Sequence, residues 1–150
     1  MSLFILLISG HMLVLIIVDP LDITPFDLTG KEFYVNEMRF QSASIINKVD
    51  FDSAIIGTSM AQNFKVNEAN LILGGKFLNL SGSGALLKER KVVLDYLFEK
   101  KNVKTVVLSL DGVTGLQRNK GIPIEAWSFL YNDSYLDNLT IYTNRKFLRY

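Results

Sequence analysis

Three short apolar runs, each closed by a turn residue, constrain the fold of this chain most. They cover residues 52–57, 76–80 and 104–110, and two segments with helical spacing of apolar residues, 66–73 and 86–101, separate them. Continuous apolar runs of this length are typical of strands buried on both faces. Strand, helix, strand, helix, strand in this order predicts a parallel sheet with right-handed crossovers and helices on both faces. We therefore expect an α/β domain of three layers.

A longer apolar segment opens the chain. Residues 1–18 carry no charged side chain and are interrupted only by Ser2, Ser9, Gly10 and His11. As a helix, this segment would span about 27 Å, close to the roughly 30 Å thickness of the hydrocarbon core of a bilayer. A cleaved signal peptide or a buried core helix would be the alternatives, but the basic flank and the small-residue cleavage pattern of a signal peptide are missing. We expect a transmembrane anchor, ended by Asp19 and Pro20.

The segment after this anchor sets the expected orientation and domain limits. Three aspartates, Asp19, Asp22 and Asp27, precede the first lysine, so no basic residue holds this side in the cytoplasm. We therefore expect the N-terminus inside and the domain outside. Residues 19–48 are predicted to form a linker with a short lead-in helix, and residues 49–150 the α/β domain.

Composition excludes several classes of site. A net charge of +1, from 16 basic and 15 acidic residues, gives no global reason to expect a nucleic-acid partner. Without cysteine, thiolate metal sites and cysteine nucleophiles are excluded. The single histidine, His11, lies in the apolar segment, where it cannot act as a base for a soluble site. No glycine-rich nucleotide motif is present, and we expect no cofactor and no metal.

The carboxyl ends of parallel strands meet at one edge of a sheet, where ligands and catalytic groups gather. Residues 57–60, 81–84 and 111–112 follow the three predicted strands and should converge there. Ser59 would present its hydroxyl beside free backbone N–H groups that could stabilise an oxyanion. Helix capping by Thr58 and Ser59 is the structural alternative. This convergence is the strongest functional signal in the sequence.

The other candidates at this edge also have two explanations. Gly82 and Gly84 could let a backbone N–H approach the same oxyanion, or could only satisfy a turn. Asp111 could position a group or bind a cation, and it is equally explained as a turn residue. Position alone leaves these alternatives open.

Together, Ile-Ile-Gly-Thr-Ser-Met, Asn-Leu-Ser-Gly-Ser-Gly and Val-Val-Leu-Ser-Leu-Asp resemble, in order and spacing, the first blocks of SGNH/GDSL-type hydrolases. Residues 19–112 resemble more narrowly the bacterial membrane-anchored SGNH-like proteins of cell-envelope polysaccharide modification. The resemblance implies the N-terminal part of a flavodoxin-like SGNH domain, held on the extracytoplasmic side of the bacterial inner membrane by residues 1–18. It also implies Ser59 as nucleophile, and an oxyanion hole formed by Ser59, Gly82 or Gly84, and Asp111.

Two departures from the family pattern bear on activity. Asp111 stands where the hydrolases place an asparagine, and a carboxylate would repel an oxyanion unless it were protonated or turned away. The final Asp-x-x-His block is absent, so Ser59 has no visible general base. We expect the 150-residue chain to be inactive alone, either as part of a longer protein or because the site has lost catalysis.

Two functions follow as hypotheses. The first is an envelope-anchored SGNH-like esterase or acyltransferase lineage that acts on an acylated glycan, with an acyl-transfer membrane protein as a further partner. The second is a non-catalytic envelope protein of the same fold that binds glycan or an assembly partner through the aromatic segment from Trp127 to Tyr135.

Overall fold

A computed structural model describes residues 2–19, 22–23, 38–110, 123–132 and 134–143. Its centre is a three-stranded parallel sheet of β1 (Ser53–Ile56), β2 (Phe77–Asn79) and β3 (Thr105–Leu108), in the order β2-β1-β3. Ser53 at the start of β1 lies opposite Phe77 of β2 and Thr105 of β3. The α/β class and the parallel sheet predicted from the sequence are confirmed.

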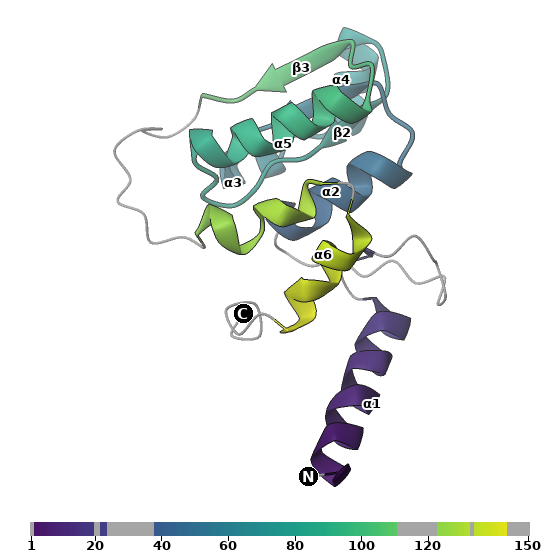
Figure 1. Cartoon of the computed structure of the whole chain (residues 1–150). Coiled ribbons are helices and arrows are strands. Elements are labelled where there is room, and N and C mark those ends of the chain that lie inside the picture. The colour runs from purple at the N-terminus through teal and green to yellow at the C-terminus, as the bar shows by residue number, and fades with distance from the viewer. Residues whose placement is uncertain (1, 20–21, 24–37, 111–122, 133, 144–150) are drawn as a thin grey trace.

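Helices fill the segments between the strands, as Figure 1 shows. In chain order the helical elements are α1 (Ser2–Val18), α2 (Met38–Lys48), α3 (Ser59–Gln62), α4 (Val66–Leu73), α5 (Leu87–Lys100), η1 (Ile124–Ala126), η2 (Ser128–Leu130), α6 (Tyr135–Leu139) and η3 (Thr140–Thr143). The predicted helices at 66–73 and 86–101 correspond to α4 and α5, and the lead-in helix corresponds to α2. Gly74, with a φ of 70°, ends α4 in a left-handed conformation that favours glycine.

Alternate residues of β1 point to opposite sides of the sheet and define three layers. Ala54 and Ile56 belong to the main core, which α2 and α5 cover, whereas Ile55 belongs to a smaller cluster with Ala61 of α3 and Phe77. Every residue of β1 is buried, as its apolar sequence predicts. The central strand β1 therefore contributes residues to both hydrophobic clusters.

The packed unit begins before residue 49. Phe40 and Ile46 of α2 lie in the main core, and so does Ile23. Asp19, which follows α1 directly, is also buried, and its Oδ1 accepts hydrogen bonds from Ile23 N at 3.1 Å and from the Tyr142 hydroxyl at 2.7 Å. These residues of the expected linker are tied to the domain.

Helix α1 extends away from the sheet in Figure 1. Leu6, Leu7 and Leu13 are exposed on it, whereas Leu15 packs against the main core. Among the described residues, no helix combines the length and the apolar character needed to cross a membrane.

The aromatic segment near the C-terminus packs onto α2 and α5. Trp127 is fully buried, and its ring meets Tyr131 edge to face at 5.4 Å, while Tyr131 meets Tyr96 of α5 in the same way at 5.5 Å. The Tyr131 hydroxyl donates to Arg39 O at 2.8 Å. Trp127 and Tyr131 are thus engaged in packing, and the side chain of Tyr135 lies outside the described part of the structure.

Candidate functional site

The loops that follow the three strands converge at the carboxyl edge of the sheet, as the parallel arrangement predicts. The N–H of Gly82, after β2, donates to Gly57 O, after β1, at 3.1 Å, and Ser109 N, after β3, donates to Ile56 O at 2.8 Å. Asp111, the predicted site residue that follows β3, lies outside the described residues. The structure therefore brings together the loops of Ser59 and Gly82 with the end of β3.

Ser59 is exposed and is the first residue of the four-residue helix α3. The residue before it, Thr58, is the N-cap, and its hydroxyl accepts a hydrogen bond from Met60 N at 3.3 Å. Capping is thus done by Thr58 and does not require the Ser59 hydroxyl. Of the two residues that could cap this helix, Thr58 does so, and Ser59 remains exposed to solvent.

Position 57 has no room for a side chain, because α3 and the end of β3 approach the backbone of Gly57 closely. A Cβ at this position would lie 2.5 Å from the Cβ of Ala61 in α3 and 2.8 Å from the Cβ of Ser109 after β3. Carbon atoms in contact normally stay about 3.5–4.0 Å apart. The glycine of the Gly-Thr-Ser sequence therefore has a packing explanation, because it lets α3 begin directly against the sheet edge.

The two glycines after β2 differ in their roles. Gly84 has a φ of 60°, in the left-handed region where glycine is favoured, so the turn itself requires it. Gly82 has room for a side chain, since an added Cβ would meet Ala85 at an ordinary 3.5 Å. Its N–H, which the resemblance assigns to an oxyanion, here donates to Gly57 O.

Asn79, the last residue of β2, joins this loop to α3, and no role was predicted for it from the sequence. Its amide nitrogen donates to Ala61 O at 2.8 Å, and its Oδ1 accepts from Ser81 N at 3.0 Å. Gln62 adds a hydrogen bond from its side chain to Ser81 O at 3.2 Å. A polar residue at the end of an apolar run was the available signal.

A buried ion pair, Arg39 of α2 with Glu89 of α5, supports the same loop. The guanidinium Nε lies 3.2 Å from Glu89 Oε1, and Nη2 also donates to Ser83 O at 2.7 Å. Glu89 Oε2 accepts from Leu86 N at 2.7 Å, which satisfies a free N–H at the start of α5. Both charged groups are thereby compensated in the interior.

Arg90 of α5 links the loop after β2 to the end of β3. It is almost fully buried, and it donates from Nε to Ala85 O at 3.0 Å and from Nη1 to Ser109 O at 2.5 Å. Charged residues of a helix with one apolar face usually lie toward water. Arg39, Glu89 and Arg90 are instead buried, where they support the loop after β2 and the end of β3.

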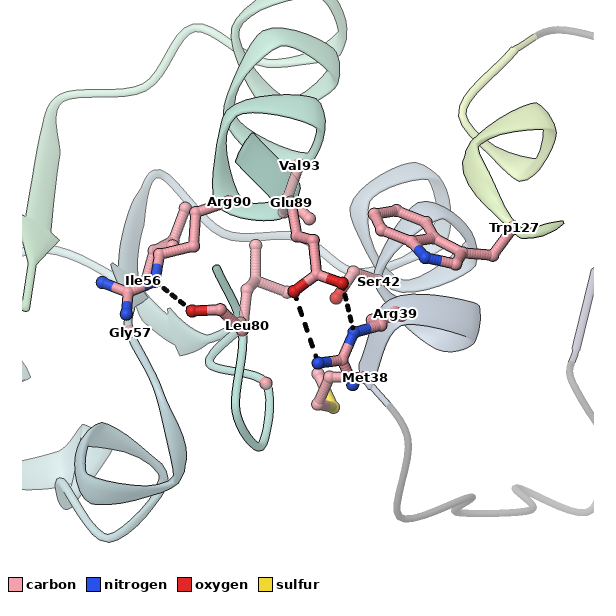
Figure 2. Close-up of a pocket in the computed structure, with 12 residues that line it drawn as sticks. Met38, Arg39, Ser42, Ile56, Gly57, Leu80, Glu89, Arg90, Val93 and Trp127 are labelled. Carbon is pink, nitrogen blue, oxygen red and sulfur yellow. Dashed lines mark hydrogen bonds and ion pairs between the residues drawn. The ribbon is translucent and has the colours of Figure 1, made fainter. Parts of the chain in front are cut away.

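A small pocket lies beneath these loops, between α2, α5, the ends of β1 and β2, and Trp127 (Figure 2). Its cavity volume is about 10 Å³, which is room for roughly one water molecule. Ser59 is not part of its wall. The pocket is therefore distinct from the predicted nucleophile, although Gly57, two residues before Ser59, lines it.

The shifted pKa values belong to the opposite, amino edge of the sheet. A hydrogen bond from the Lys104 ammonium group, at 2.7 Å, lowers the pKa of Asp52 to about 2, and a hydrogen bond from Lys76 N acts in the same direction. The hydrogen bond between Lys76 and Asp50 lowers the pKa of that carboxyl and raises the pKa of the lysine. These ion pairs tie strand starts together, away from Ser59.

Among the described residues, no three His, Asp or Glu side chains gather closely enough to hold a metal ion. Comparisons of the chain with protein-family models, with curated proteins and with solved structures found no match.

Proposed function

We propose that this chain derives from SGNH-type hydrolases and presents Ser59 to an acylated glycan of the bacterial cell envelope, without turning it over alone. The observation that carries the proposal is the placement of an exposed Ser59 directly after β1, beside the glycine loop that follows β2. The strand order β2-β1-β3 supports it, because flavodoxin-like sheets begin with this order and bind ligands at this edge.

The lack of turnover follows from the proton balance of acyl transfer. When a serine Oγ attacks an acyl carbon, its proton must pass to a base, and the departing sugar oxygen must receive one. The only histidine in the sequence is His11 in α1, so the α/β part contains no histidine for this transfer. Ser59 would depend on a base supplied from outside this part of the chain.

Membrane attachment through residues 1–18 belongs to the same proposal. The segment is apolar and uncharged, and Leu6, Leu7 and Leu13 of α1 are exposed rather than packed on the domain. In this proposal the domain stands on the extracytoplasmic side of the bacterial inner membrane, where acylated envelope glycans are found. The acyl-transfer partner would be met in the same membrane.

An assay with a supplied base tests whether Ser59 is competent. The chain is mixed with p-nitrophenyl acetate, with and without imidazole, and compared with Ser59→Ala and with Ser83→Ala, an exposed serine on the neighbouring loop. We expect imidazole to produce a burst of p-nitrophenolate and an acetylated chain with wild type and with Ser83→Ala. Ser59→Ala should show only the background reaction of imidazole with the ester.

Equal bursts from wild type and Ser59→Ala would remove Ser59 as a nucleophile. That outcome would favour the non-catalytic function, in which the domain only binds a glycan or an assembly partner. Binding would then need a surface other than Trp127 and Tyr131, because both contribute to internal packing.

A further inference from the structure

Two residues that line the pocket beneath the strand-end loops each have a buried polar atom without a hydrogen-bond partner among the described residues. Ser42 of α2 and Trp127 both line it, and neither Ser42 Oγ nor Trp127 Nε1 has a hydrogen-bond partner among the described residues. Ser42 is 1% exposed and Trp127 is 0% exposed. Figure 2 shows both side chains among those that line the pocket.

An unpartnered buried donor is costly, at about 1–3 kcal/mol for each group, and native proteins rarely keep one. Two such atoms on one small pocket are therefore evidence for a molecule that bonds to both. The indole N–H can only donate, whereas the serine hydroxyl can donate or accept. The ligand must accordingly offer a hydrogen-bond acceptor to Trp127.

The charged residues of the wall indicate an uncharged ligand. Arg39 is paired with Glu89, and Arg90 donates to the carbonyl oxygens of Ala85 and Ser109. These contacts already compensate the guanidinium groups, and an anion would also face the Glu89 carboxylate. A neutral acceptor avoids that repulsion.

The size of the pocket limits the ligand further. Its cavity volume of about 10 Å³ accommodates roughly one oxygen atom, such as that of a water molecule. Apolar side chains, including Ile56, Leu80 and Val93, form much of the remaining wall. Of the lining residues only Met38 is partly exposed, so it marks the side on which the pocket approaches solvent.

We propose that this pocket binds a single uncharged oxygen atom through Ser42 and Trp127, carried by a water molecule or by the hydroxyl group of a small alcohol. The ligand links the C-terminal helical segment to α2, next to the loops of Gly57 and Gly82. This site is independent of Ser59 chemistry and would remain if Ser59 proved inert.

Nuclear magnetic resonance on the full, ¹⁵N-labelled chain tests the proposal, because Trp127 is the only tryptophan and its indole resonance is unambiguous. A resident water predicts a rotating-frame Overhauser peak between the indole proton and water, with the sign that excludes simple exchange. A bound alcohol predicts a saturable shift of the indole resonance on titration with methanol, with loss of the water peak. Either result supports the proposal and identifies the source of the oxygen.

Two serine variants localise the signal. Ser42→Ala should abolish the peak or the saturable shift, because a single remaining polar partner does not hold a buried water well. Ser81→Ala is the matched control, since Ser81 Oγ is also buried without a partner among the described residues but does not line the pocket. We expect Ser81→Ala to behave as wild type.

Several outcomes would overturn the proposal. Absence of both the water peak and a saturable methanol shift in wild type would show that nothing binds there, and this result does not depend on any variant folding. A saturable indole shift with sodium chloride at constant ionic strength would assign the site to an anion instead. An unchanged signal in a folded Ser42→Ala chain would remove Ser42 from the site.

Discussion

Alanine at position 57 tests the packing on which the Ser59 turn depends. The new Cβ would lie 2.5 Å from the Cβ of Ala61 and 2.8 Å from the Cβ of Ser109. Neither atom is the far end of a flexible side chain, so α3 or the end of β3 must move by about 1 Å to restore normal contact. Overpacking of this kind costs about 1–3 kcal/mol.

Urea unfolding followed by the fluorescence of the buried Trp127 measures this effect. With an m-value of about 2 kcal/mol per M, the expected loss lowers the midpoint by roughly 0.5–1.5 M. Gly82→Ala is the matched control, because its Cβ would meet Ala85 at 3.5 Å, and we expect its midpoint to stay close to wild type. If both variants unfold at the same urea concentration, the close approach at Gly57 does not constrain the turn.

A second change, Ala61→Gly, separates the two contacts. In the Gly57→Ala background it removes the nearer carbon, so the double variant should lose less stability than the two single changes predict together. The glycine itself costs about 1 kcal/mol in a helix, which the single Ala61→Gly variant measures. Simple additivity would assign the strain to Ser109 instead.

Two further predictions concern the ion pairs at the two ends of the sheet. Because the hydrogen bond from Lys104 lowers the pKa of Asp52 to about 2, below its value in the unfolded chain, Asp52 stabilises the fold above about pH 4, and this contribution disappears as the pH falls toward 2. Thermal unfolding should therefore show Asp52→Asn less stable than wild type at pH 7 but nearly equal to it at pH 2, and an equal difference at both pH values would contradict the assignment. Arg39→Met should lower the free energy of unfolding by about 3–5 kcal/mol, because Glu89 keeps a buried charge, and adding Glu89→Gln should recover part of the loss. Urea unfolding of both chains measures this, and equal stability of the single and double variants would show that the two charges are not coupled.

The regular elements could be predicted because their signals are local. The apolar runs gave β1, β2 and β3 within a few residues, and helical spacing gave α4 with the same ends as the structure. Glycines supplied the stops, as the positive φ of Gly74 and Gly75 illustrates. Parallel pairing then followed from the alternation of strands and helices, which leaves few topologies open.

The support of the candidate site could not be predicted, because it depends on pairs far apart in the sequence. Arg39 and Glu89 are separated by 50 residues, and a helical pattern alone assigns charged residues to the solvent face. Tyr131 reaches Arg39 across 92 residues, so the aromatic segment could be mistaken for an exposed surface. Such contacts become visible only when the helices are placed on the sheet.

The motifs that carry the family resemblance have mostly structural explanations. Gly57 accommodates the close packing of α3, Thr58 caps that helix, and Gly84 adopts a left-handed turn. A non-catalytic protein of the same fold would need the same residues, so their presence does not separate the two hypotheses. Ser59 differs, since its side chain is exposed and capping does not use it. The choice between hydrolase lineage and binding protein therefore depends on this one residue, and the comparison of Ser59→Ala with Ser83→Ala addresses it directly.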